Sequence, residues 1–195
     1  MVISMFKIKY RITDMITAQE NRPMLEIQND GGYIDGFFEI IVNDKTYGYS
    51  HERPLEEGER GFELISTWLY HLVQMTDLFI SGHQYIGLSD IDSYCSWIEF
   101  KRISEDSMSI SIINTESKVD MPFLMTEVIH GAKYSRWAHE IVLYEDVIQE
   151  VINVTKIYLN EVWTKNPRLR EATELIDLNK LCVITEMKIK QLSKN

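Results

Sequence analysis

The chain has 195 residues, of which 45% are hydrophobic and 11% aromatic, and it contains only nine glycines and four prolines. This composition is typical of a packed globular domain and excludes a linker or an unstructured tail. Thirty acidic residues against twenty basic ones give a net charge of −10. That balance argues against nucleic acid as a ligand, because phosphate binding needs a concentrated basic face.

The cysteines and the N-terminal segment indicate the compartment. Cys95 and Cys182 lie far apart with no CxxC spacing, which supports neither a disulfide framework nor a zinc ribbon. Charged residues interrupt the apolar pattern of residues 1 to 11. No later stretch approaches the roughly 18 uncharged apolar residues of a membrane span. We therefore expect a cytoplasmic protein that does not enter a membrane.

Alternating apolar and polar residues predict strands near the N-terminus. Residues 6 to 12 have the two-residue period of a strand with one solvent-facing side. A second short strand is expected at residues 24 to 28. The Asn43-Asp44 turn predicts that residues 36 to 42 and 45 to 50 form a hairpin. The polar face of the first strand should expose Lys7, Lys9 and Arg11.

A helix is predicted over residues 60 to 80, because apolar residues recur there at helical spacing. Gly82 follows at the position where a glycine ends a helix. The stripe that should face the core comprises Phe62, Ile65, Leu69, Leu72 and Phe79.

Strands resume after this helix, at residues 84 to 88, 94 to 103 and 107 to 113. In the last of these, apolar residues alternate with serines, and the serine side should face water. That side comprises Ser107, Ser109 and Ser111. Two more strands are expected at residues 123 to 130 and 136 to 143, separated by a turn that contains Gly131.

Helical spacing returns over residues 144 to 163, and Pro167 closes that helix. Residues 168 to 192 are also predicted to be helical, either as one helix or as two elements. This order of elements favours an α+β fold, with an antiparallel sheet packed against a central helix and C-terminal helices. We expect residues 1 to 166 to form the α+β domain, and residues 167 to 195 a C-terminal helical extension packed on it.

The sequence contains no nucleophile elbow, phosphate-binding loop or dinucleotide fingerprint, and its five histidines have no metal-ligand spacing. We therefore predict no cofactor and no metal. Asp90 and Asp92 could chelate a divalent ion, but their place in a turn favours a capping role. Cys95, beside Trp97, is interpreted as a small buried hydrophobe rather than a nucleophile. His71 is interpreted as a half-buried histidine bonded to a backbone carbonyl.

The one compact group of base, acid and cation is His51-Glu52-Arg53-Pro54. It lies in the connection between the hairpin and the first helix, and connections often carry function. An acid–base role for His51 would need a carboxylate to orient the ring and a substrate pocket nearby. The alternative is a solvated loop.

The same connection is strongly acidic. Its carboxylates could attract a basic protein surface, and exposed tyrosines near the hairpin could anchor that partner. The alternative is that the glutamates after residue 55 only stabilise the N-terminus of the following helix. The candidate partner-binding residues are Glu52, Glu56, Glu57, Glu59, Tyr33, Tyr47 and Tyr49.

The layout from residue 36 to 115 resembles that of a known group of proteins. A Trp-bearing helix (Gly61-Phe62 through Trp68-Leu69-Tyr70-His71-Leu72) precedes a Trp-centred strand (Ser96-Trp97-Ile98-Glu99-Phe100) and a polar-alternating strand in an acidic domain. This organisation resembles the small acidic bacterial immunity proteins of polymorphic and contact-dependent toxin systems. The resemblance implies a non-enzymatic cytoplasmic protein that binds one toxin domain and blocks its active site, and it assigns no individual residue.

Three functions follow from these patterns. The first is a protein-binding module that masks the active site of a basic toxin domain. The second is a structural or homo-oligomeric protein that associates through its Trp-rich surfaces and its basic C-terminal segment. The third is an enzyme with a site assembled by the fold around His51.

Overall fold

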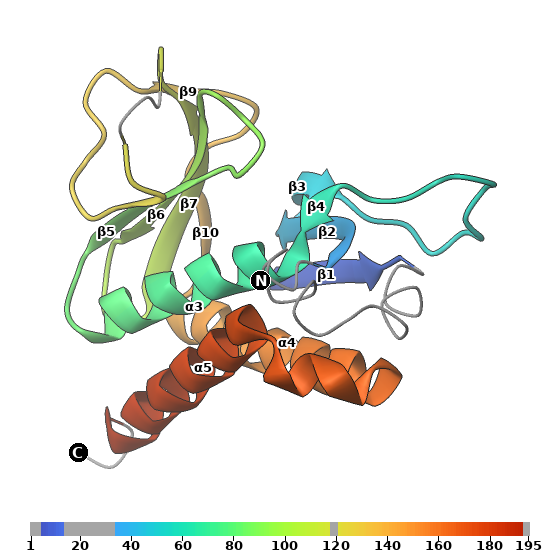
Figure 1. Cartoon of the computed structure of the whole chain (residues 1–195). Helices are drawn as coiled ribbons and strands as arrows, with labels where there is room; N and C mark the ends of the chain where they lie inside the picture. Colours follow the sequence, from blue (N-terminus) through green and yellow to red (C-terminus); the bar gives the residue numbers. More distant parts are fainter. Residues whose placement is uncertain (1–4, 14–33, 118–120, 193–195) are drawn as a thin grey trace.

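The computed structural model describes residues 5–13, 34–117 and 121–192. Two antiparallel sheets and three α-helices form these parts of the chain, so the predicted α+β class is confirmed (Figure 1). The strand expected at residues 24 to 28 lies outside the described residues. Within the described residues, no helix combines the length and the apolar character needed to cross a membrane.

The first sheet confirms the N-terminal strand and the hairpin. Its order is β1 (Phe6–Ile12), β2 (Asp35–Val42) and β3 (Lys45–Tyr49), and the short β4 (Glu63–Leu64) also pairs with β2. Ile8 and Tyr47 both lie opposite Ile40, so all three side chains share the buried face. On the other face Lys7 and Lys9 are exposed, as expected, whereas Arg11 is half-buried.

The central helix, α3 (Ile65–Ile80), begins five residues later than predicted. Glu63 and Leu64 pair with Asp35 and Gly36 of β2, so the chain is extended where helix was expected. Phe62 is 75% exposed and does not belong to the apolar stripe. The end of the helix agrees with the sequence, because Gly82 has a φ of 105°, a conformation that favours glycine.

The second sheet has the order β10–β7–β6–β5–β8, and β9 pairs with β7. The three strands predicted before residue 114 are confirmed as β5 (Tyr85–Ser89), β6 (Ser96–Arg102) and β7 (Ser107–Asn114). The two strands expected after them are much shorter. They correspond to β8 (Leu124–Met125) and β10 (Glu140–Leu143), with β9 (Lys133–Tyr134) between them.

The predicted exposure of the serine face of β7 is wrong. Ser109 and Ser111 are 6% and 0% exposed, and Ser111 accepts a hydrogen bond from the backbone N–H of His139. This face belongs to a second, smaller apolar cluster, and chain from the region after residue 120 covers it. The cluster comprises Tyr85, Trp97, Ile113 and Ile129.

Two long helices complete the fold. α4 (Tyr144–Lys165) confirms the predicted helix, and Pro167 opens the short 3₁₀ helix η2 (Pro167–Glu171), after which α5 (Thr173–Leu192) follows. α3 contacts both α4 and α5 (Figure 1). Leu175, Leu178 and Cys182 of α5 are buried in the same core as the first sheet. The division of the chain at residue 166 stays a prediction.

Candidate partner-binding site

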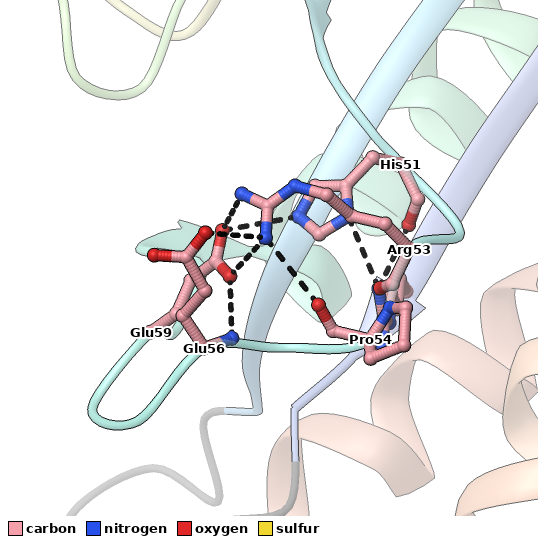
Figure 2. Close-up of polar contacts among 6 residues, drawn as sticks. His51, Arg53, Pro54, Glu56 and Glu59 are labelled. Carbon is pink, nitrogen blue, oxygen red and sulfur yellow. Dashed lines mark hydrogen bonds and ion pairs between the residues drawn. The ribbon is translucent and has the colours of Figure 1, made fainter.

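The connection between β3 and β4, residues 50–62, extends away from the body of the molecule (Figure 1). We call it the acidic loop. Arg53 and Glu59 close it from within: Nη1 of Arg53 donates to Oε2 of Glu59 at 2.8 Å, and Nη2 donates to Oε1 at 2.6 Å (Figure 2). The backbone N–H of Glu56 also donates to Glu59. This N–H and the Arg53 guanidinium lower the pKa of Glu59, which keeps it ionised in the loop.

Arg11 of β1 ties the loop to the sheet. Its Nη1 donates to the backbone carbonyl of His51 at 3.0 Å and to that of Arg53 at 2.6 Å. It also lies 3.2 Å from Nδ1 of His51. A guanidinium only donates hydrogen bonds, so Nδ1 can take part in this contact only as an acceptor. A single cation therefore holds the backbone of the loop at His51 and Arg53.

The two requirements for an acid–base role of His51 are partly met. A carboxylate is near, because Nε2 lies 3.3 Å from Oε1 of Glu59, although without the alignment of a hydrogen bond. A pocket of about 750 Å³ is lined by His51, Glu52 and Ile157 among others. However, Nδ1 is engaged by Arg11 and Nε2 is buried. Ring packing against Phe37, at 4.6 Å between centroids, further favours a role in positioning the loop over proton transfer.

The predicted acidic residues divide into two groups. Glu52, Glu56 and Glu57 are exposed, whereas Glu59 is half-buried and turned toward Arg53 and His51. The alternative helix-capping role is wrong, because α3 begins at Ile65 and has no acidic residue in its first turn. Three exposed carboxylates remain instead of four, and one of them, Glu56, also lies 3.5 Å from Nη1 of Arg53.

The three predicted aromatic anchors differ in their exposure to solvent. Tyr33 lies outside the described residues. Tyr47 is 6% exposed and its hydroxyl donates to Asp90, so its predicted exposure is wrong. Tyr49, at the start of the acidic loop, is 57% exposed. Phe62, at the other end of the loop, is 75% exposed and was not among the predicted aromatic anchors. Gly61 is a poor helix former and was the signal that the helix had not yet begun.

Other groups considered from the sequence have structural partners. Oδ1 of Asp90 accepts the backbone N–H groups of Asp92 and Ser93, which confirms the capping role in a turn. His71 bonds to Gln74 rather than to a backbone carbonyl, and it stacks on Phe123 with 4.7 Å between ring centroids. Burial lowers the pKa of this histidine.

The cysteines and possible metal ligands add no reactive centre. Cys95 is half-buried and Cys182 is buried. In the part of the chain that the structure describes, no group of three or more His, Cys, Asp or Glu side chains is placed to hold a metal ion. The acidic loop combines exposed glutamates with two exposed aromatic side chains, Tyr49 and Phe62, at its two ends.

Comparison with known proteins adds no relative. No protein-family model, no curated protein and no solved structure matches the chain.

Proposed function

We propose that this protein is a non-enzymatic protein-binding module whose acidic loop binds a basic surface of another protein. In the form that the sequence layout suggests, the partner is a toxin domain, and the loop masks its cationic active site. The observation that carries the proposal is that the loop is held in one shape by Arg11 and by the Arg53–Glu59 pair while its remaining carboxylates face outward.

Pre-organisation is what separates this loop from an ordinary solvated connection. A loop that is ordered before binding loses less conformational entropy when the complex forms, so more of the contact energy appears as affinity. The ion pair and the Arg11 contacts hold the backbone at both sides of the turn at Gly58, which has a φ of 79°. Glu56 and Glu57 are presented on this turn.

Charge and apolar surface would have separate tasks in the complex. The outward carboxylates, together with a net charge of −10, speed the encounter with a basic partner by long-range attraction. Exposed aromatic residues commonly supply most of the binding energy. Tyr49 and Phe62 are 57% and 75% exposed and stand at the two ends of the loop, so they are the anchors of this proposal.

The test compares two charge-reversed proteins with the same net charge. In the loop variant Glu52, Glu56 and Glu57 are replaced by Lys, and in the control variant three exposed glutamates elsewhere are replaced by Lys, namely Glu105, Glu116 and Glu127. Each protein is used to capture partners from the source cytosol, with and without the product of the neighbouring gene. Association rates with the captured protein are then measured at low and high salt.

The loop variant should associate roughly tenfold or more slowly at low salt, and the difference should shrink at high salt. The control variant should retain most of the wild-type rate. The proposal is wrong if every captured protein binds the loop variant and the control variant equally well.

Self-association is the second candidate, and the outer surface of α5 favours it. Val183, Ile184 and Met187 are 46%, 51% and 56% exposed and lie within about one helical turn of one another. A second copy of the chain could cover these side chains. Sedimentation velocity across a concentration series tests this, because Ile184→Lys should abolish any dimer that the wild-type protein forms.

A further inference from the structure

A small pocket lies at the base of the acidic loop. Tyr49, the last residue before the loop, and Glu63, the first residue after it, both line the pocket, which has a volume of about 290 Å³. Small-molecule sites usually have roughly 300–1,000 Å³, so this pocket suits a single side chain better than a larger ligand. Four aromatic residues line it: Phe38, Tyr47, Tyr49 and Trp68.

Two carboxylates from different parts of the fold also line this pocket, Glu63 from β4 and Asp90 from the end of β5. Oε2 of Glu63 accepts the indole N–H of Trp68 at 2.7 Å. Its other oxygen, Oε1, accepts no hydrogen bond from the described residues, so one acceptor remains for a ligand. Asp90 accepts the hydroxyl of Tyr47, which places its negative charge beside an aromatic wall.

The cation among the lining residues is Arg136. Its guanidinium carbon lies 5.7 Å from the centroid of the Tyr47 ring, within the distance of a cation–π contact. Arg136 is itself exposed, and it reaches this wall from the segment between β9 and β10. The chain thus already places a guanidinium against one wall of the pocket.

We propose that this pocket receives an arginine side chain of the basic partner, which displaces the guanidinium of Arg136. The inference rests on the proposed function and names the group that the site would recognise. Arginine fits better than lysine, because a planar guanidinium stacks on aromatic rings and directs its N–H groups at carboxylates in a fixed fork. An anionic ligand would meet two carboxylates.

The test uses a defined small probe, Nα-acetyl-arginine methylamide, titrated into the ¹⁵N-labelled full chain. The neutral citrulline analogue, which has nearly the same shape, is the control ligand. The readout is the indole N–H signal of Trp68, because that group donates to Glu63. The indole of Trp97, bonded to Thr115, serves as an internal reference. We expect a saturable shift of the Trp68 signal with arginine and none with citrulline.

Three variants sharpen the test. Glu63→Gln keeps an acceptor for Trp68 but removes the charge, and it should weaken probe binding roughly tenfold. Arg136→Gln removes the competing cation and should tighten binding by a factor of roughly two to five. Glu56→Gln with Glu57→Gln, on the loop, should leave the Trp68 titration unchanged. If Glu63→Gln does not fold, the Arg136→Gln comparison still decides.

The inference is overturned if arginine and citrulline shift Trp68 equally, if neither shifts it, or if Arg136→Gln weakens binding. These outcomes are distinct from failure of the proposed function. If the arginine probe binds and the loop variant still captures partners normally, the pocket proposal stands and the acidic-loop proposal is rejected. The reverse pattern would retain the loop and reject the pocket.

Discussion

Replacing Arg11 by Met removes the contact between β1 and the acidic loop while keeping an unbranched stem on the strand. Arg11 makes two part-buried contacts to His51 and one exposed hydrogen bond to the carbonyl of Arg53. Hydrogen bonds to charged groups contribute about 1.5–3 kcal/mol each. Counting only the two part-buried contacts at the lower end, we expect the free energy of unfolding to fall by about 3 kcal/mol.

Urea denaturation measures this change, which corresponds to a midpoint lower by about 1 M for a slope of roughly 2–3 kcal/mol/M. Hydrogen exchange should also become faster in residues 51 to 59, because the loop loses its attachment to the sheet. Lys7→Met is the matched control, since Lys7 is an exposed cation on the same strand. It should change stability by less than about 0.5 kcal/mol. An Arg11→Met protein with wild-type stability and wild-type exchange in the loop would refute the argument that β1 pre-organises the site.

Three further outcomes are expected. Burial raises the pKa of Glu174. Its ionisation therefore costs stability as the pH rises from the pKa of the unfolded state through that of the folded state. Urea titrations should show that Glu174→Gln raises the free energy of unfolding, relative to wild type, more at pH 7 than at pH 4. A Cβ at Gly61 would overlap the backbone of β2, so Gly61→Ala should lower the thermal midpoint by about 10 °C or more. Gly58 has open space but a positive φ, so Gly58→Ala should cost about 1–2 kcal/mol, which lowers the midpoint by about 2–8 °C. Burial raises the pKa of the Cys182 thiol to about 11, so a thiol reagent should modify Cys95 in the native protein and reach Cys182 only after unfolding.

The sequence predicted elements whose apolar pattern is local and unambiguous. β1, the β2–β3 hairpin and α4 appear where the two-residue and helical periods place them. The predicted start of α3 was wrong because Phe62 continues the helical spacing by coincidence. Its true environment depends on the pairing of Glu63 and Leu64 with β2, about thirty residues earlier in the chain. Local periodicity contains no information on that pairing.

The predicted exposure of the serine face of β7 was wrong for a related reason. Alternation tells which residues share a face, but not what covers that face. Ser111 is buried because the segment that carries His139 returns across the sheet. Gly87 allows similarly close packing, since a Cβ there would lie 2.7 Å from the Cδ1 atom of Ile129. A small residue on the same face of the sheet, two strands away from Ser111, is consistent with a covered face, but the covering segment has no regular pattern of its own.

The candidate site was predicted by composition and not by geometry. Four glutamates close together indicated an acidic surface, and three of them are exposed. Glu59 faces inward because it pairs with Arg53, six residues earlier in the same loop. The hydrogen bonds from Arg11 to the loop depend on the position of β1 in the sheet. The pocket below the loop joins residues from β2, β3, β4, α3 and the end of β5, which no spacing in the sequence brings together.

The way in which the acidic loop is closed bears on how such a protein could change its partner. The Arg53–Glu59 pair seals the loop, and the tight backbone approach of Gly61 to β2 fixes the point at which it rejoins the sheet. The residues between them, Pro54 to Gly58, are largely exposed, and a Cβ added at Gly58 would meet no other atom within 4 Å. Under the proposed function, side chains at this tip can vary while Arg11, Arg53, Glu59 and Gly61 stay constant, because Glu56 holds Glu59 through its backbone N–H. Variation in recognition would then be uncoupled from the stability of the scaffold.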